Sequence, residues 1–219
     1  MTDESPSRTY RQQQAQATKD RIVAAARVLM AERGWASTTV DAIAAEAGVA
    51  PQTVYAAFGS KLAIVEGMRR TMLRESKIPE LLAEAATESD FSRRLELWAK
   101  SIRQQMETSY DVISIHRQAA RSNPRFAAEY RKVLDNRSRV FTEFIHDLRA
   151  GLAPGVDEGT ATDLLWALAN EELYRELVEE RGWPPERYER WLAQTLIDQL
   201  LRSPATPNRT PPETNPSNQ

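Results

Sequence analysis

The chain has 219 residues, no cysteine and a formal net charge of −2. The absence of cysteine excludes disulfide scaffolds, thiolate zinc sites and cysteine nucleophiles. No apolar run is long enough to span a bilayer, and the N-terminus lacks the apolar core of a signal peptide. We therefore expect a soluble, cytoplasmic protein that does not bind membranes.

Charge is distributed unevenly along the chain. Residues 1–77 hold 11 basic and 8 acidic side chains, a net charge of +3, and the remainder carries a net charge of −5. A mildly basic head on an acidic body fits contact with nucleic acid through one end of the molecule.

Both ends of the sequence are predicted to lack fixed structure. Residues 1–18 are polar, and residues 203–219 contain five prolines and no large apolar side chain. Because such segments bury too little surface to offset the entropy lost on ordering, we interpret them as a flexible N-terminal arm and a disordered tail. Basic residues in and just after the arm either reach DNA or only keep the chain soluble. These residues are Arg8, Arg11, Lys19 and Arg21.

Between the two ends, apolar residues recur at helical spacing. In chain order, the first four helices are predicted at about residues 18–33, 39–47, 51–58 and 60–76. Gly34 and Gly48 are expected to end the first two, because glycine adopts the left-handed conformation without steric cost. Ser60 is expected to cap the fourth helix.

The later helices are predicted to be longer. An apolar stripe at helical spacing contains Phe91, Leu95, Trp98, Ile102 and Met106. Further helices are predicted at about residues 110–120, 124–150, 160–181 and 185–202. Because no stretch alternates with period two for long enough to form a strand, the predicted fold class is all-α.

The segment 38–62 reads TTVDAIAAEAGVAPQTVYAAFGSKL and predicts two short helices joined by a tight turn. Gly48 suits the turn, Pro51 suits the first position of the second helix, and Val54 and Phe58 point into a three-helix core. This pattern is typical of a helix-turn-helix, whose second helix places polar side chains in the major groove of DNA. The predicted DNA contacts are Thr39, Pro51, Gln52, Thr53, Tyr55 and Lys61.

The same segment resembles the DNA-binding region of the tetracycline-repressor (TetR) family. The matching residues are Thr39-Val40, Ile43-Ala44, Ala47-Gly48-Val49, Val54-Tyr55, Phe58 and Ser60-Lys61. The resemblance implies a three-helix helix-turn-helix domain over residues 19–64, followed over residues 65–202 by an antiparallel helical bundle for ligand binding and dimerisation. It also implies a homodimer that binds a palindromic double-stranded operator, represses transcription and is released by a small lipophilic or aromatic effector.

Three alanines depart from the family's pattern. Ala50 stands where the family often has a serine or threonine that caps the recognition helix, and losing such a cap typically costs about 1 kcal/mol. Ala56 and Ala57 replace larger side chains, so base recognition is expected to depend on Gln52 and Thr53. These departures make the operator sequence harder to infer, but they leave the fold prediction unchanged.

The resemblance also suggests functions for the C-terminal helices. A dimer interface would draw on apolar residues of the last two helices, namely Leu164, Leu168, Leu173, Leu177, Trp191, Leu192, Leu196 and Leu200. Some of these must instead face the subunit's own core. An effector pocket would lie among the central helices, with the candidates Trp98, Ile102, Met106, Tyr110, Ile113, His116, Phe126, Tyr130, Phe141 and Trp166. For each candidate, ordinary core packing is the alternative.

The sequence gives little support to functions other than a repressor. A helical enzyme finds no support in a nucleophile–base pair, a phosphate-binding glycine loop or a metal cluster, so we expect no catalytic residue, metal or cofactor. His116 has no histidine partner at metal-ligand spacing and is expected to be structural. An activator, a DNA-binding protein without an effector, and a protein that has lost specific recognition stay open.

Overall fold

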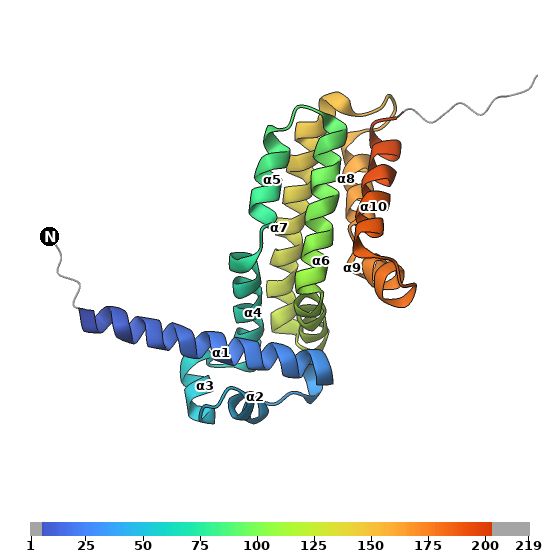
Figure 1. Ribbon diagram of the computed structural model, residues 1–219. Coiled ribbons are helices and arrows are strands. Elements are labelled where there is room, and N and C mark those ends of the chain that lie inside the picture. Colours follow the sequence, from blue (N-terminus) through green and yellow to red (C-terminus); the bar gives the residue numbers. More distant parts are fainter. Residues whose placement is uncertain (1–5, 203–219) are drawn as a thin grey trace, which may run out of the picture.

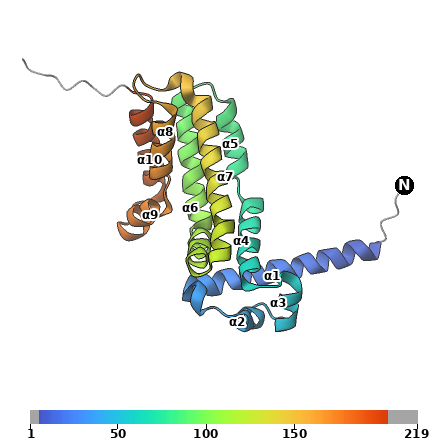
Figure 2. The same ribbon diagram turned by 180° about the vertical axis from the view of Figure 1, so that it is seen from behind.

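The structure is a computed structural model that describes residues 6–202. Over these residues the chain is helical and contains no strand, which confirms the predicted all-α class. A head that contains the first three helices lies at one end of a body formed by the later ones (Figures 1 and 2). No helix of the described part is both long enough and apolar enough to cross a membrane.

The head contains α1 (Pro6–Ser37), α2 (Val40–Glu46) and α3 (Pro51–Phe58), and α4 (Lys61–Glu75) leads from it into the body. Ser60 caps α4 as predicted, because its Oγ accepts the N–H of Ala63 at 3.2 Å. Apolar side chains of these helices share one core, which includes Ile22, Ala26, Met30, Ile43, Val54, Ile64 and Met68. Burial of this apolar surface is the main force that holds α2 and α3 in place.

The body contains α5 (Ile78–Thr87), α6 (Phe91–Ser122), α7 (Pro124–Leu148), α8 (Glu158–Leu168), α9 (Glu171–Tyr174) and α10 (Pro185–Leu200). A 3-10 turn at Arg149–Gly151 follows α7, and a π-helical turn at Arg175–Glu180 follows α9. α6 and α7 run side by side through the body, with α4 and α5 on one side and α8 and α10 on the other (Figures 1 and 2). The core between them includes Trp98, Phe141, Ile145, Leu165 and Tyr188.

The first helix begins well before the predicted Thr18. It starts at Pro6 and projects from the head past α3 and α4 (Figure 1), so the predicted flexible arm is helical wherever the structure describes it. The prediction took the polar composition as a sign of disorder, although Gln, Ala and Arg have high helix propensity. Gly34 ends the regular helix as predicted, with φ +79°. Residues 1–5 and the predicted disordered tail at 203–219 lie outside the described residues.

Two predicted helix boundaries in the body are wrong. The helix predicted at 110–120 is the second half of α6, because buried Ser109 continues the apolar stripe instead of interrupting it. The helix predicted at 160–181 is broken after α8. There the Asn170 side chain accepts the N–H of Glu172 at 2.8 Å and caps a new helix, α9.

Three residues predicted at the dimer interface lie inside their own chain. Leu192, Leu196 and Leu200 have no exposed surface, because they occupy the face of α10 that packs on α6 and the rest of the body core. The prediction could not separate the two faces of α10 without knowing its neighbours. The other five keep partial exposure: Leu164, Leu168, Leu173, Leu177 and Trp191.

Candidate nucleic-acid interface and adjoining cavity

The turn between α2 and α3 is fixed by backbone hydrogen bonds. Gly48 has the predicted left-handed conformation, with φ +65°. Its N–H donates to the Ala45 carbonyl at 3.2 Å, and the N–H of Val49 donates to the Ala44 carbonyl at 3.0 Å. This pair of bonds is a Schellman motif, which satisfies the last carbonyls of a helix and redirects the chain. The short turn therefore sets the angle at which α3 leaves α2.

α3 turns one face to the core and the other to solvent. Val54 is 1% exposed, whereas its neighbour Tyr55 is 53% exposed. Gln52 is also exposed, and Thr53 is half-buried. Because successive residues of a helix point about 100° apart, burial of Val54 directs these polar neighbours away from the core. The N-terminal part of α3 thus presents polar side chains of the kind that reach base edges and phosphates.

The other predicted DNA contacts lie at helix starts. Thr39 is exposed and caps α2, since its Oγ1 accepts the N–H of Ala42 at 3.1 Å. Pro51 occupies the first turn of α3, and Ala50 before it forms no side-chain cap. Thr39 and Pro51 thus lie at the N-terminal ends of α2 and α3, and not on the outer face of α3 itself.

Lys61 is held inside the head by contacts that the motif did not indicate. Its Nζ donates to the carbonyls of Trp35 and Thr38, both at 2.8 Å, and lies 4.0 Å from the centroid of the Trp35 ring. Burial lowers the pKa of this ammonium group. Two of its three N–H donors are therefore used to tie the start of α4 to the end of α1.

The missing cap on α3 gives a direct prediction. Ala50 is exposed and has the extended backbone of a cap residue, with φ −70° and ψ 148°. A serine there has room to accept a backbone N–H of the first turn, so Ala50→Ser should raise the free energy of unfolding by about 1 kcal/mol. Urea unfolding followed by circular dichroism measures this change. An unchanged or lower unfolding midpoint would contradict it.

A cavity of about 220 Å³ lies in the body next to the head. α4, α5, α6 and α7 all contribute to its wall. Seven of the ten predicted pocket residues line it, namely Trp98, Ile102, Met106, Ile113, His116, Tyr130 and Phe141. The cavity is mainly apolar, with a few polar groups, as is usual for small-molecule sites.

The remaining three predicted pocket residues do not line this cavity. Tyr110 is half-buried on α6 away from it, and Phe126 packs into the head core. Trp166 lies behind the wall, where its ring meets Phe141 edge-on at 5.8 Å. All three are aromatic residues in packing contacts, which helical spacing alone does not distinguish from a pocket wall.

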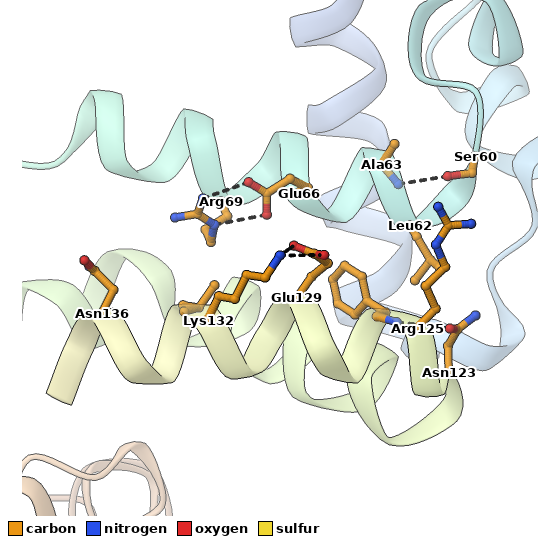
Figure 3. Close-up of a pocket in the computed structure, with 12 residues that line it drawn as sticks. Ser60, Leu62, Ala63, Glu66, Arg69, Asn123, Arg125, Glu129, Lys132 and Asn136 are labelled. Atoms are coloured by element: carbon orange, nitrogen blue, oxygen red, sulfur yellow. Dashed lines mark hydrogen bonds and ion pairs between the residues drawn. The ribbon is translucent and has the colours of Figure 1, made fainter. Parts of the chain in front are cut away.

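An open groove between α4 and the first half of α7 adjoins the cavity (Figure 3). On α4, Arg69 donates to both carboxylate oxygens of Glu66, at 3.1 and 2.7 Å. On α7, Lys132 Nζ donates to both carboxylate oxygens of Glu129, at 3.0 and 3.1 Å. Figure 3 shows these two ion pairs facing each other across the space between the helices. The charges of these two pairs neutralise each other within each helix, and Arg125 of α7 adds a further positive charge to the groove.

Comparison with known families decides what the head is. Residues 22–68 match the model of the bacterial regulatory proteins of the tetR family. The head of the chain is therefore similar to the DNA-binding domain of this family. No curated protein sequence matches the chain.

Solved structures share the fold of this chain across head and body. NalD of Pseudomonas aeruginosa, the secondary repressor of the MexAB-OprM multidrug efflux pump, is 22% identical with a TM-score of 0.68, covering 87% of this chain and 98% of its own. A Saccharomonospora viridis transcriptional regulator in complex with choline is 21% identical with a TM-score of 0.68, covering 86% and 100%. FadR of Bacillus subtilis in complex with stearoyl-CoA is 17% identical with a TM-score of 0.67, covering 82% and 97%. At these identities the likeness establishes the fold alone.

Several contacts that the sequence did not predict join the head of the chain to its body, and two of them involve ionisable side chains of α1 and α6. Arg27 of α1 pairs with Asp111 of α6 through Nε at 2.5 Å and Nη2 at 2.8 Å, and Nη2 also donates to the Thr108 carbonyl at 2.6 Å. Buried His116 of α6 places Nε2 3.0 Å from the Val65 carbonyl of α4. Because their partners are 84 and 51 residues away along the chain, no local motif could indicate either contact.

The His116 contact predicts how the regulator responds to acid. Burial lowers the pKa of His116 below its ordinary value of 6.5, against the opposing effects of the Val65 carbonyl and Glu66. The unfolded chain therefore binds this proton more readily, so the stability that neutral His116 contributes is complete above about pH 6.5. It is lost as the pH falls below that value, at up to about 1.4 kcal/mol per pH unit.

Urea unfolding at a series of pH values measures this loss. His116→Gln should remove the part of the acid-induced fall that belongs to the buried ring. The matched control is His146→Gln, because His146 is the only other histidine and is exposed. Equal slopes for the two variants below pH 6.5 would show that His116 makes no such contribution.

Proposed function

We propose that the regulator is a homodimeric repressor that binds a palindromic operator through α3 and is released by a small lipophilic or aromatic effector in the cavity. Residues 19–64 serve DNA binding in this proposal, and residues 65–202 serve effector binding and dimerisation. The observation that carries it is the orientation of α3, in which Val54 is buried while Gln52 and Tyr55 are exposed.

Each polar residue of α3 has a chemical role in this proposal. The Gln52 amide is suited to a bidentate bond with adenine, and the Thr53 hydroxyl to a base or phosphate. The Tyr55 hydroxyl is suited to a phosphate, which fixes position without reading sequence. Thr39, at the start of α2, would hold the neighbouring backbone.

A dimer is supported by the partly exposed apolar residues of α8 and the segments after it. Leu164 and Leu168 pack against the body core of their own chain yet remain half-buried. Pairing α8 and α10 with their copies would cover them and form a four-helix bundle. Two heads related in this way would bind half-sites about one DNA turn apart, ~34–36 Å.

Release by an effector is supported by the position of the cavity. α4 forms part of its wall and also carries the head, and the His116–Val65 contact joins α6 to α4 beside it. A ligand that displaces α4 would change the spacing of the two α3 helices and shift the population away from DNA-binding dimers. Complexes of relatives with choline and with stearoyl-CoA support a small-molecule site on this fold.

Fluorescence anisotropy tests the DNA-binding part directly. The purified chain is titrated into labelled duplexes from its own upstream intergenic region and into scrambled duplexes, at about 150 mM salt. We expect a preference of about a thousandfold or more for one upstream segment. Weak and equal binding to all duplexes would contradict the proposal.

A further inference from the structure

The cavity wall has an excess of positive charge. Arg69 and Arg137 both line it, and no Asp or Glu does so within residues 6–202. Arg69 is neutralised by its bidentate pair with Glu66. Of the two arginines of the wall, Arg137 is the one without a bidentate ion pair.

Arg137 is incompletely paired. Its guanidinium lies 5.0 Å from the Phe141 ring and 4.9 Å from the Trp166 ring, and it donates one hydrogen bond, to the Ala169 carbonyl. Glu171 lies 4.0 Å away, at the outer limit of an ion pair and too far for a hydrogen bond. That carboxylate instead accepts from Arg117 at 2.9 Å.

The charge on Arg137 persists despite its burial. Its side chain is only 26% exposed, and burial lowers its pKa. A guanidinium nevertheless stays protonated at neutral pH, and it has five N–H donors to satisfy. A buried charge with so few acceptors is costly unless another group pairs with it.

A second donor of the wall also lacks an acceptor. Trp98 is 3% exposed, and its indole N–H has no hydrogen-bond partner in the described part of the chain. A buried donor left without an acceptor is destabilising. The rings of Trp98 and Phe141 lie 5.4 Å apart, and the Arg137 guanidinium lies 5.0 Å from the Phe141 ring, so the unpaired indole N–H and the incompletely paired guanidinium belong to one region of the wall.

We propose that the effector is a small amphipathic carboxylate, whose apolar body lies in the cavity and whose carboxylate pairs with Arg137. This inference rests on the proposed function, because it names the class of molecule that the effector site takes. A carboxylate offers two acceptor oxygens, which match a guanidinium through two parallel hydrogen bonds. The apolar body would contact residues such as Ile102, Met106 and Val140.

The cavity also limits the size and path of the ligand. A water-sized group occupies roughly 30 Å³. The cavity volume of about 220 Å³ therefore holds about seven such groups in a row, which is close to the size of an eight-carbon chain. Three residues line both the cavity and the groove of Figure 3, namely Arg69, Val133 and Asn136. The groove between α4 and α7 is therefore the mouth through which the ligand enters.

Binding of three eight-carbon probes to the full chain without DNA tests the inference. Octanoate, octan-1-ol and octylammonium are titrated in a buffer free of other organic anions, and tryptophan fluorescence is followed because Trp98 lines the cavity. Octanoate should bind about tenfold or more tightly than octan-1-ol, and octylammonium should bind most weakly. Equal binding of acid and alcohol, a preference for the amine, or no binding of any probe at millimolar concentration would overturn the inference.

Two arginine variants locate the anion site. Arg137→Gln should remove the preference for octanoate and leave octan-1-ol binding unchanged, which also shows that the cavity is still formed. Arg139→Gln is the matched control, since Arg139 is exposed on the same helix and pairs with Glu143 at 2.7 Å. A preference for octanoate that survives in Arg137→Gln would overturn the assignment. Octanoate binding without any release of operator DNA would instead contradict the proposed function alone.

Discussion

Val54→Asp should unfold the head, whereas the same substitution one residue later should leave it folded. Val54 is 1% exposed in the head core, so an aspartate there buries a charge with no partner. The expected loss of stability is about 3 kcal/mol or more, a large share of the stability of an ordinary domain. Urea unfolding monitored by circular dichroism measures this loss.

Tyr55→Asp is the matched variant on the opposite face of α3. Because Tyr55 is 53% exposed, its replacement should change the free energy of unfolding by less than about 0.5 kcal/mol. The added negative charge should nevertheless weaken DNA binding about tenfold or more through repulsion by phosphates. Equal destabilisation by the two variants would mean that α3 is oriented differently.

The second large effect is expected on the oligomeric state of the chain. The double variant Leu164→Glu, Leu168→Glu should be monomeric at micromolar concentration. A dimer of this variant would bury four carboxylates between the two copies of α8, which is energetically costly. Both leucines are only half-buried in the isolated chain, so the monomer itself should remain folded. Operator binding should fall together with the dimer, since each monomer holds only one α3.

Sedimentation equilibrium measures the oligomeric state. Val28→Glu is the control, because Val28 is an exposed apolar residue of α1, far from α8 in the chain, at 49% exposure. This variant should sediment as the wild-type chain does. A dimeric double variant would show that the interface lies on another face of the molecule.

The head was predictable from sequence because its determinants are local. α2 ends through bonds from Gly48 to a residue three positions earlier and from Val49 to a residue five positions earlier, and Ser60 caps α4 through a residue three positions later. Such short-range bonds leave fixed spacings in the sequence. The continuous α6 was missed because a buried serine, Ser109, lies in its apolar stripe.

Seven of the ten predicted pocket residues line the cavity, but contacts that depend on distant residues were not predictable. Arg137 lines the cavity because α7 packs against the end of α8, where the Ala169 carbonyl accepts its bond. Lys61 matches the family motif, yet its ammonium group binds the carbonyls of Trp35 and Thr38 at the end of α1 and just after it. Likewise, leucine spacing on α10 indicated an apolar face but not whether that face meets its own chain or a partner.

We expect the exposed face of α3 to read DNA sequence. Anisotropy at about 150 mM salt compares the wild-type chain with a Gln52→Ala, Thr53→Ala double variant on the preferred upstream duplex and on its scrambled form. Because each base contact contributes about 1–3 kcal/mol of discrimination, the variant should lose about a hundredfold in preference and keep its affinity for the scrambled duplex. An unchanged preference in the variant would contradict the claim.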